Sequence, residues 1–581
     1  MRSLDTDILI LGSGGAGLFA ALHAHRAAPD ASIMVAVKGL LGKCGCTRMV
    51  QGGYNVALAP GDSVERHFMD TIEGGKWLPD QELAWQLVTL AIERIRELEN
   101  ELGCFFDRNP DGTIHQKAFA GQTFDRTVHK GDLTGIEIIN RLAEQVWERR
   151  IGRLEDHRAV ALVKNRAGDA LAGVLLIDIR SGEYVLVRAK AVLLATGGGP
   201  TMYRYHTPSG DKSCDGLAMA LDAGLALRDM EMVQFHPTGL LAGAHTRMTG
   251  TVLEEGLRGA GGHLLNGAHE RFMPACDPLA ERATRDLVSR AMYGEMRAGR
   301  LTPNGGLYIS MAHLGRERVS QQFKGMVERC ADCGFDLAGG LVEVVPTAHY
   351  MMGGVEFSPD CSTSLPGLFV AGEDAGGVHG ANRLGGNGVA NSTVYGGIAG
   401  DTMARWIASQ DGRQEPDPEA VSEAVSNCEP RAGGAPSSLE PIREQLYDTM
   451  WHRVGILRDA KGLAAGLSDL AAIEGELDRH SFDAASRTFN LAWHDWLNLK
   501  SLAKVSRVIA QAALAREDSR GAHFREDFPQ TGALDRSAFS SVRQVGERLD
   551  LTMKPVAFTR VRPGESLLAA HEPSAAGESN P

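Results

Sequence analysis

The sequence predicts an α/β fold in which a Rossmann-type domain, interrupted by an insertion, is followed by a helical bundle. Residues 7–38 give an apolar strand, a glycine-rich turn, an alanine-rich helix and a second apolar strand. Buried-strand patterns that end in glycine or acidic residues recur at 190–199 and 367–373, and from about residue 439 apolar residues recur at helical spacing. Strands alternating with helices are typical of a parallel sheet, and the later periodicity is typical of packed helices.

The turn after the first strand carries Gly12, Gly14 and Gly17 in G-x-G-x-x-G spacing. Gly12 permits the tight turn, Gly14 lets the backbone approach a pyrophosphate, and Gly17 lets the helix lie close to the strand. The helix N-terminus, which includes Gly15, offers free N–H groups to the phosphates. Because a strand precedes these glycines and a helix follows them, we predict a dinucleotide cradle.

The second strand ends in Lys38, where an NAD-binding unit usually carries an acidic residue for the ribose hydroxyl. NAD is therefore disfavoured. The segments that contain Thr196 and Gly197 and that end at Glu373 add two further strand ends to the cradle. A ligand that is held at adenine, pyrophosphate and isoalloxazine needs such extra contacts, so we predict FAD as the cofactor.

Composition limits the possible partners. The chain has 581 residues, of which 43% are apolar, and a net charge of −13, which argues against nucleic acid. No apolar run approaches the roughly 18 residues of a membrane span. The first strand begins within a few residues of Met1, which leaves no room for a signal peptide. We therefore expect a cytoplasmic protein without direct membrane insertion, peripheral to the inner membrane only through partners.

The cysteines predict no metal site. Nine cysteines are spread along the chain without a disulfide framework. Cys330 and Cys333 form a single C-x-x-C, and no four-cysteine iron–sulfur run accompanies it. Electrons must then enter or leave a flavin through another protein, a soluble carrier or oxygen.

Changes in composition and periodicity divide the chain into units. The expected units, in chain order, are an FAD-binding domain in two segments (1–235 and 345–405), an α+β capping and substrate domain inserted between them (236–344), a linker (410–438), a helical domain (439–530), a small C-terminal unit (531–568) and a disordered tail (569–581).

Polar residues gather in motifs within and just after the insertion. They are QFHPTG with His236, EEGLRGAGG with Glu255 and Arg258, ATRDLV with Arg285, PTAHYMMGG with His349, and HGANRLGGN with Arg383. Together with YRYHTPSGD, RDMEMVQFHPTG and DSRGAHFREDFP, these motifs resemble the flavoprotein subunit of the succinate dehydrogenase and fumarate reductase family, which includes L-aspartate oxidase. The likeness runs from about residue 5 to 560.

The resemblance implies a site for a dicarboxylate. It assigns substrate binding to His236, His349 and Arg383, and it places Phe119 of KAFAGQ against the substrate. An arginine suits this task because its guanidinium can hold a carboxylate through two hydrogen bonds.

The resemblance also implies a proton donor. Arg285 would protonate one substrate carbon while the flavin exchanges a hydride with the neighbouring carbon, and Glu255 and Arg258 would relay the proton from solvent. In water arginine is a poor acid, because its pKa exceeds roughly 12. Burial among other cations disfavours its charged form and makes this role feasible.

For the cofactor, the strand ends and the resemblance together indicate Gly12, Gly14, Gly15, Gly17, Lys38, Cys46, Gln51, Gly52, Gly53, Thr196, Gly197, Asp215, Glu373 and Asn387. Cys46 lies where respiratory members of the family carry a histidine bonded covalently to the flavin. A thioether is one alternative, because a thiolate is a competent nucleophile. We favour noncovalent FAD, since aspartate oxidases also lack the histidine and an ordinary thiol is mostly protonated at pH 7. We expect a noncovalent flavin to have a lower potential, which favours alkene reduction.

Glu254 is a second departure, because the family usually has Thr or Ser there against the far carboxylate of the substrate. Two carboxylates repel each other unless one is protonated or a cation lies between them. In one alternative the far end of the substrate carries an ammonium, a hydroxyl or an amide. In the other, Glu254 turns toward an arginine, Arg247 or Arg258, and Thr249 or Thr251 takes its place.

The sequence therefore predicts an FAD enzyme that transfers a hydride at a C–C bond of a C4-type dicarboxylate or close analogue, in the reductive direction. Its electron partner would be an iron–sulfur subunit or a soluble carrier. L-aspartate oxidase is the first alternative, and the extension past DFP counts against it. A flavin-binding subunit without chemistry of its own is the second, and the joint presence of the polar motifs counts against that.

Overall fold

The computed structural model describes residues 1–243, 246–429, 437–481 and 486–568. Its central sheet has the strand order β6 (Gly152–Leu154), β2 (Ile33–Ala36), β1 (Arg2–Leu11), β9 (Tyr184–Leu194), β8 (Leu171–Asp178) and β7 (His157–Lys164), and β16 (Leu368–Val370) also pairs with β9. β1, β2, β6, β9 and β16 are parallel, whereas β7 and β8 pair in antiparallel fashion.

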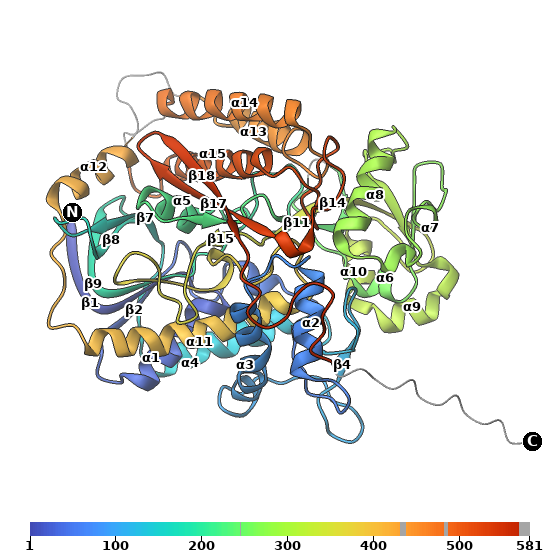
Figure 1. The fold of residues 1–581 in the computed structure, drawn as a ribbon, viewed down its shortest axis with the longest axis horizontal. Helices are drawn as coiled ribbons and strands as arrows, with labels where there is room; N and C mark the ends of the chain where they lie inside the picture. Colours follow the sequence, from blue (N-terminus) through green and yellow to red (C-terminus); the bar gives the residue numbers. More distant parts are fainter. Residues whose placement is uncertain (244–245, 430–436, 482–485, 569–581) are drawn as a thin grey trace, which may run out of the picture.

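Three helices lie together beneath this sheet in Figure 1. They are α1 (Gly15–Ala27), α4 (Thr134–Glu148) and α11 (Asn387–Ala408), and α1 packs against both others. α1 crosses close to β1 because residue 17 is glycine: a Cβ there would lie 2.0 Å from the carbonyl oxygen of Gly12. The N-terminus of α1 is thereby placed at the carboxyl end of β1, as the glycine spacing predicts.

Further elements belong to this part of the chain. They are η1 (Cys46–Met49), β3 (Tyr54–Asn55), α2 (Val64–Gly74), α3 (Gln81–Asn100), β4 (Gln116–Lys117), β5 (Thr127–Val128), α5 (Asp215–Asp222) and η4 (Gly372–Asp374). The side chains of Ser63 and Asp80 cap α2 and α3 by accepting hydrogen bonds from backbone N–H groups of the first turn.

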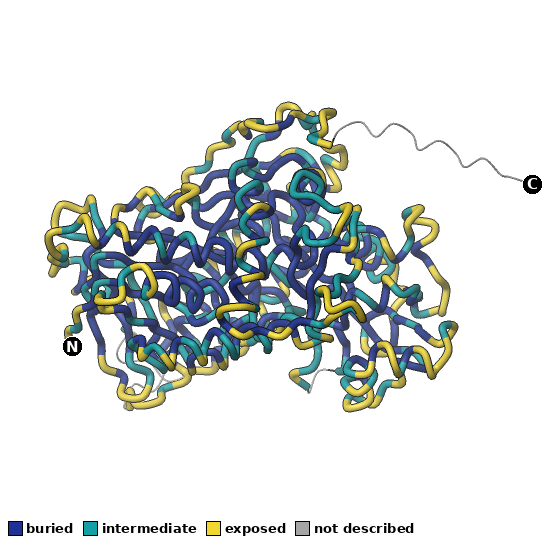
Figure 2. Tube along the Cα trace, turned by 90° about the horizontal axis from the view of Figure 1, so that it is seen from below, coloured by how far each residue is buried: buried dark blue, intermediate teal, exposed yellow. Residues whose placement is uncertain are grey.

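The inserted segment forms a lobe of its own, at the right of Figure 1. Its antiparallel sheet has the order β11 (Val233–Leu240), β14 (Leu341–Met351), β13 (Leu307–Ser310) and β12 (His263–Leu265). Its helices are α6 (Gly256–Gly259), α7 (Met273–Cys276), η2 (Ala280–Arg282), α8 (Arg285–Arg297), η3 (Ala312–Leu314), α9 (Arg316–Gln322) and α10 (Lys324–Asp332). Leu257, Val288 and Ile309 are fully buried in a core that belongs to this lobe, and Figure 2 shows buried chain inside it. The expected boundaries of the capping domain, 236 and 344, fall within β11 and β14.

A helical layer lies above the central sheet in Figure 1 and consists of α13 (Glu440–His452), α14 (Ala460–Arg479) and α15 (Leu491–Ala515). α14 packs against both of the others. Buried side chains of this layer, Leu446, Leu470 and Trp493, share one apolar core with Val187 of the sheet. The predicted α/β fold with a C-terminal helical region is therefore present.

The C-terminal half differs from expectation in two places. The segment 410–438, predicted as a linker, contains α12 (Pro418–Cys428), which is capped by Asp417 and buries Val421 and Cys428. The unit 531–568 is not separate, because β17 (Ala538–Val545) and β18 (Arg548–Pro555) continue a sheet begun by β15 (Gly354–Val355) and β10 (Leu227–Arg228). β15 and β10 are too short to show a strand pattern in the sequence. The expected disordered tail, 569–581, lies outside the described residues.

Two kinds of feature are absent from the part of the chain that the structure describes. No helix there is both long and apolar enough to cross a membrane. No three His, Cys, Asp or Glu side chains among those residues are grouped so that they could hold a metal ion. Cys330 is buried and Cys333 is partly buried, and both are free thiols.

Candidate active site

A long groove begins at the carboxyl ends of the parallel strands and reaches the inserted lobe. We call the two parts of this cavity the nucleotide lobe and the inner lobe, whereas the inserted lobe is a part of the chain. The nucleotide lobe is lined by 11–14, 36–38, 44–45, 157–159, 196–197 and 211–215. The second part, the inner lobe, continues past Gly15 to His236, Arg285, His349 and Arg383. Gly14, Gly45, Thr196, Gly197 and Lys212 line both parts.

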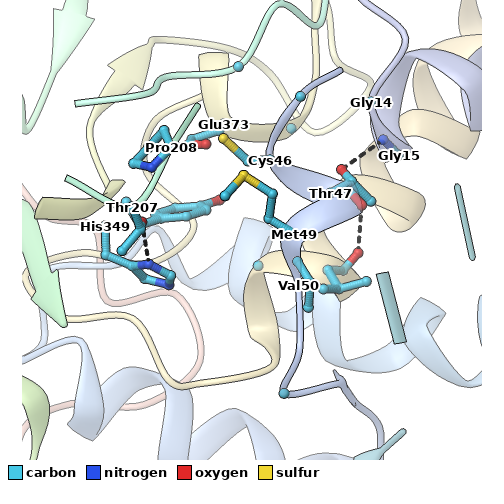
Figure 3. A pocket seen from close by; sticks show the side chains of 18 of the residues that line it. Gly14, Gly15, Cys46, Thr47, Met49, Val50, Thr207, Pro208, His349 and Glu373 are labelled. Carbon is cyan, nitrogen blue, oxygen red and sulfur yellow. Dashed lines mark hydrogen bonds between the residues drawn. The ribbon is translucent and has the colours of Figure 1, made fainter. Parts of the chain in front are cut away.

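The groove fits a dinucleotide cofactor. α1 points its N-terminus at the junction of the two lobes, where unpaired N–H groups favour phosphate. Gly14 offers an open approach, because a Cβ there would contact only the hydroxyl oxygen of Thr47, at 3.5 Å. That hydroxyl also accepts a hydrogen bond from the backbone N–H of Gly15 at 3.0 Å (Figure 3). The N-terminus of α1 therefore offers N–H groups to a phosphate, and the glycine at position 14 leaves room for that phosphate beside the backbone.

Asp215 places an acidic side chain beside the end of β2. Asp215, at the start of α5, lines the nucleotide lobe and accepts hydrogen bonds from Lys38 at 2.9 Å and from Arg158 at 2.7 Å. Burial opposes its charge, but the two cations hold the pKa of Asp215 below its usual value. Lys38 therefore pairs with a carboxylate of α5 that lines the nucleotide lobe.

Cys46 lies in the wall of the inner lobe next to Glu373 (Figure 3). Burial and the neighbouring Glu373 raise the pKa of the Cys46 thiol to about 12. The thiol is therefore protonated at neutral pH, and a protonated thiol is a weak nucleophile.

Arg383 precedes α11 and is buried at the far end of the inner lobe. Its Nε has no hydrogen-bond partner among the described residues, and the guanidinium lies 4.3 Å from the ring centroid of Tyr350. Burial and the charge of Arg285 lower the pKa of Arg383 to about 10, so the group remains charged at neutral pH. A buried cation with unused donors favours an anionic ligand.

Two histidines flank Arg383. The backbone N–H of Thr238 donates to Nδ1 of His236 at 3.3 Å, which leaves the proton on Nε2. Nδ1 of His349 lies 2.8 Å from the hydroxyl of Thr207 (Figure 3). Burial and the nearby arginines hold the pKa of both histidines well below the usual value. Both imidazoles are therefore neutral and can donate hydrogen bonds without adding charge.

A row of ion-paired side chains leads from the inserted lobe to the inner lobe of the cavity. Arg285, the first residue of α8, donates to Oε2 of Glu255 at 2.7 Å, and Arg258 donates to Oε1 at 2.9 Å. Burial opposes the charge of Glu255, but Arg285 and Arg258 lower the pKa of its carboxyl to about 2. Arg285 and Glu255 line the inner lobe, whereas Arg258 is buried behind them.

Glu254 lines the inner lobe and pairs with Lys117 of β4 at 2.7 Å. Neither Arg247 nor Arg258, the partners considered from the sequence, takes this role: Arg258 binds Glu255, and Arg247 is exposed. The pair joins the inserted lobe to the FAD-binding part. Thr251 also lines the inner lobe, whereas the hydroxyl of Thr249 donates to the carbonyl of Gly243.

Two family models match the chain. One described as "FAD binding domain" matches residues 7–389, and one described as "Fumarate reductase flavoprotein C-term" matches residues 443–568. The chain belongs to the succinate dehydrogenase/fumarate reductase flavoprotein family. FAD is accordingly its cofactor, as the glycine cradle predicts.

Known members of this flavoprotein family are similar along nearly their whole length. One subunit of the fumarate reductase (CoM/CoB) of Methanothermobacter marburgensis is 39% identical over 539 residues, which cover 91% of this chain and 95% of that protein. The fumarate reductase flavoprotein subunit of Escherichia coli is 33% identical over 549 residues, covering 91% and 89%. A solved structure of the Escherichia coli quinol fumarate reductase flavoprotein aligns with a TM-score of 0.90 at 30% identity, covering 97% of this chain and 99% of that one.

Most of the residues that the flavoprotein resemblance indicates meet in this groove. The inner lobe is lined by Gly14, Gly15, Cys46, Gln51, Gly52, Gly53, Phe119, Thr196, Gly197, His236, Glu254, Glu255, Arg285, His349, Glu373 and Arg383. The nucleotide lobe adds Gly12, Lys38 and Asp215.

Three indicated residues lie outside both linings. Arg258 is behind Glu255, and Gly17 is beneath Gly12. Asn387 is fully buried, where its Oδ1 accepts from Asn55 at 2.8 Å and lies 3.0 Å from Nε2 of His67. Asn55 also donates to the carbonyl of Gly385 at 2.6 Å. The structure thus makes Asn387 part of the support of the loop that carries Arg383, rather than a lining residue.

Sequence reasoning missed several residues of the groove. Thr207 and Tyr350 lie within or beside quoted motifs, so their neighbours could have indicated them. Lys212 directly follows YRYHTPSGD, and Lys117, which pairs with Glu254 of the lining, begins KAFAGQ. Their positions next to or within these motifs mark the segments, but nothing in the sequence shows which cavity or partner a single lysine reaches.

Proposed function

We propose that this chain is the flavoprotein of a fumarate reductase-type enzyme, an FAD-dependent oxidoreductase that acts on the CH–CH group of a C4 dicarboxylate or close analogue. The observation that carries this proposal is Arg383. It is a buried, charged guanidinium whose Nε lacks a partner in the described structure, in the same cavity as the Arg285–Glu255–Arg258 chain and the cofactor cradle.

The charge of the inner site supports a dicarboxylate. Arg258, Arg285 and Arg383 face the single carboxylate of Glu255, and both histidines are neutral, so the cluster has a net charge of two positive units. Glu254 and Lys117 cancel each other. A dianion therefore compensates the cluster, and Arg383 with His236 and His349 supplies donors for one of its carboxylates.

We assign to Arg285 the donation of a proton to the substrate carbon. Bound FAD supplies the hydride equivalent of the reaction. Arg285 reaches the inner lobe while Glu255 holds its Nε and Nη2, which orients the guanidinium and leaves a short route for proton replacement from Arg258. Burial of these charges keeps water away from them and strengthens their interactions.

The electron partner is a separate component in this proposal. The relatives are named as subunits of fumarate reductases. The described residues hold no group of three metal ligands. We infer that electrons reach the flavin from an iron–sulfur subunit or a soluble carrier, and that any membrane association is peripheral and through that partner. In the same proposal, 236–344 acts as the capping domain.

The alternatives are less well supported. L-aspartate oxidase is not favoured, because relatives that share 33% to 39% of residues over nine-tenths of the chain are named fumarate reductases. A subunit without chemistry is not favoured, because a scaffold has no use for a buried arginine with unused donors.

An anaerobic reoxidation experiment tests the proposal. The flavin of the purified chain is photoreduced, and fumarate, mesaconate and iminosuccinate are added in turn. We expect fumarate or a close analogue to reoxidise the flavin in the wild type and to leave the Arg285→Gln flavin reduced. Reoxidation by iminosuccinate alone would support the oxidase instead, and no reoxidation by any acid would support a subunit without chemistry.

A further inference from the structure

Lys212 occupies the junction between the nucleotide lobe and the inner lobe. It lines both, and its Nζ donates to the carbonyl of Thr196 at 3.0 Å. The ammonium lies close to both walls: a Cβ on Gly45 would be 3.6 Å from Nζ, and a Cβ on Gly197 would be 3.8 Å from it. Because both neighbours are glycines, the side chain has room to move within the junction.

The charge of Lys212 has no ion-pair partner among the described residues. Lys38, in the nucleotide lobe, is instead paired with Asp215 at 2.9 Å. Burial opposes the charge of Lys212, but the neighbouring acidic groups, the Cys46 thiol first and then Asp211, hold the pKa of its ammonium above the usual value. The groove therefore contains a protonated amine that makes only a carbonyl contact, and such a group attracts an anion.

The anion is defined by the order of groups along the groove. In this architecture the end of β2 receives the ribose of the adenosine and the glycine turn receives the pyrophosphate. The isoalloxazine then extends into the inner lobe, toward Arg285 and Arg383. The pyrophosphate must cross the junction, which is lined both by Gly14, just before α1, and by Lys212.

We propose that Lys212 is a second arm of the pyrophosphate site, which holds the FAD diphosphate together with the N-terminus of α1. Its ammonium replaces the weak carbonyl contact by charge-assisted hydrogen bonds to phosphate oxygens. The inference rests on FAD binding and is independent of the proposed reaction.

Opposite effects on cofactor affinity and on apoprotein stability follow. Lys212→Met keeps the aliphatic stem and removes the charge. We expect FAD to dissociate about tenfold to hundredfold faster from the full-length holoenzyme, as for the loss of one charge-assisted hydrogen bond. The apoprotein should unfold at the same temperature as wild type or higher, because a buried charge without an ion-pair partner is removed.

The experiment uses two controls. Lys212→Arg keeps the charge and should keep FAD affinity within a few-fold of wild type. Lys43→Met removes an exposed lysine of the neighbouring segment and should change nothing. FAD release is followed by flavin fluorescence after dilution, at low and high salt. The wild-type affinity should fall more steeply with salt than that of Lys212→Met.

Competition by ADP and by riboflavin identifies the part of FAD that Lys212 holds. Lys212→Met should weaken ADP binding by the same factor as FAD binding and leave riboflavin binding unchanged. Unchanged ADP binding, or an equal loss of riboflavin binding, overturns the assignment. So does an apoprotein that unfolds several degrees earlier, since the residue would then be structural.

Discussion

At the level of single residues, charge pairing decides which groups of the inner lobe are free to meet a ligand. Glu255 occupies Arg285 and Arg258, and Lys117 occupies Glu254. Arg383 is left with a buried donor that no described residue uses. This pairing underlies the two roles that we propose, a proton relay through Arg285 and a carboxylate clamp at Arg383.

Arg285→Gln and Arg383→Ala should separate these two roles. We expect Arg285→Gln to lower kcat by about 10² to 10⁴, the usual worth of a general acid, and to keep FAD bound. Arg383→Ala should also raise KM, because a two-point carboxylate contact is lost. Steady-state kinetics and the flavin absorbance spectrum measure both effects. Near-normal turnover of the Arg285 variant would contradict the assigned proton donor.

Glu254 and Lys117 should have opposite effects on specificity. Glu254→Thr removes a carboxylate from the lobe and leaves Lys117 to attract the far carboxylate of fumarate, so kcat/KM for fumarate should rise about tenfold or more. Lys117→Met leaves Glu254 unpaired and should lower it. If both variants lower kcat/KM alike, the pair only joins the inserted lobe to the FAD-binding part.

Cys46 should leave the flavin unattached. Because its thiol is buried beside Glu373 and its pKa is raised to about 12, no thiolate is available at neutral pH to form a thioether. Acid precipitation should release the FAD into the supernatant, in wild type and in Cys46→Ala alike. Flavin fluorescence that stays with the wild-type polypeptide on a denaturing gel, and is lost in Cys46→Ala, would establish the covalent link.

At the level of elements, the turn between β1 and α1 combines a folding requirement with a binding requirement. Gly17 is needed for the crossing of helix and strand, since a Cβ would meet the carbonyl of Gly12 at 2.0 Å. Gly14 has space for a Cβ in the protein itself. We therefore propose that glycine at this position serves the approach of the cofactor.

Alanine substitutions distinguish these requirements. Gly17→Ala should destabilise the protein by a few kcal/mol, because backbone must shift to relieve the clash. Gly14→Ala should leave the apoprotein within about 0.5 kcal/mol of wild type and weaken FAD binding at least tenfold. Urea unfolding of the apoproteins and FAD titration measure the two effects. Equal loss of stability in both variants would refute the distinction.

At the level of the whole molecule, buried ion pairs tie distant segments together. Glu231 lies between β10 and β11 and accepts hydrogen bonds from Arg516, just after α15, at 2.6 Å and from Ser540 of β17 at 2.6 Å. All three side chains are buried. The helical layer and the C-terminal strands are thereby joined to the FAD-binding part, which explains why 531–568 does not form an independent unit.

Glu231→Gln should therefore destabilise the whole protein. The substitution leaves Arg516 with only its longer ion pairs to Asp229 at 3.7 Å and Asp518 at 3.5 Å, at a cost of about 3 kcal/mol. Lys504→Gln, which breaks a more exposed pair with Asp222, should cost less than about 1 kcal/mol. Denaturant unfolding of the holoenzyme compares the two, and equal small losses would show that the Glu231 contacts contribute little.

The sequence by itself determined the local elements and the family. The glycine spacing specified β1, the turn and α1, because each glycine answers a steric need within a few residues. Ordered motifs identified His236, Arg285, His349 and Arg383, and the structure brings these four residues into one cavity. Helical periodicity predicted helices in the region of α13, α14 and α15 for the same local reason.

Only the tertiary structure decided which distant groups meet. It paired Glu254 with Lys117, which are 137 residues apart, and it paired Asp215 of α5 with Lys38 near the end of β2. It placed Lys212 at the junction of the two lobes and Asn387 outside their linings. A side chain's partner depends on how distant parts of the chain pack together. That packing arises from the sum of many weak apolar contacts, which no short stretch of sequence specifies.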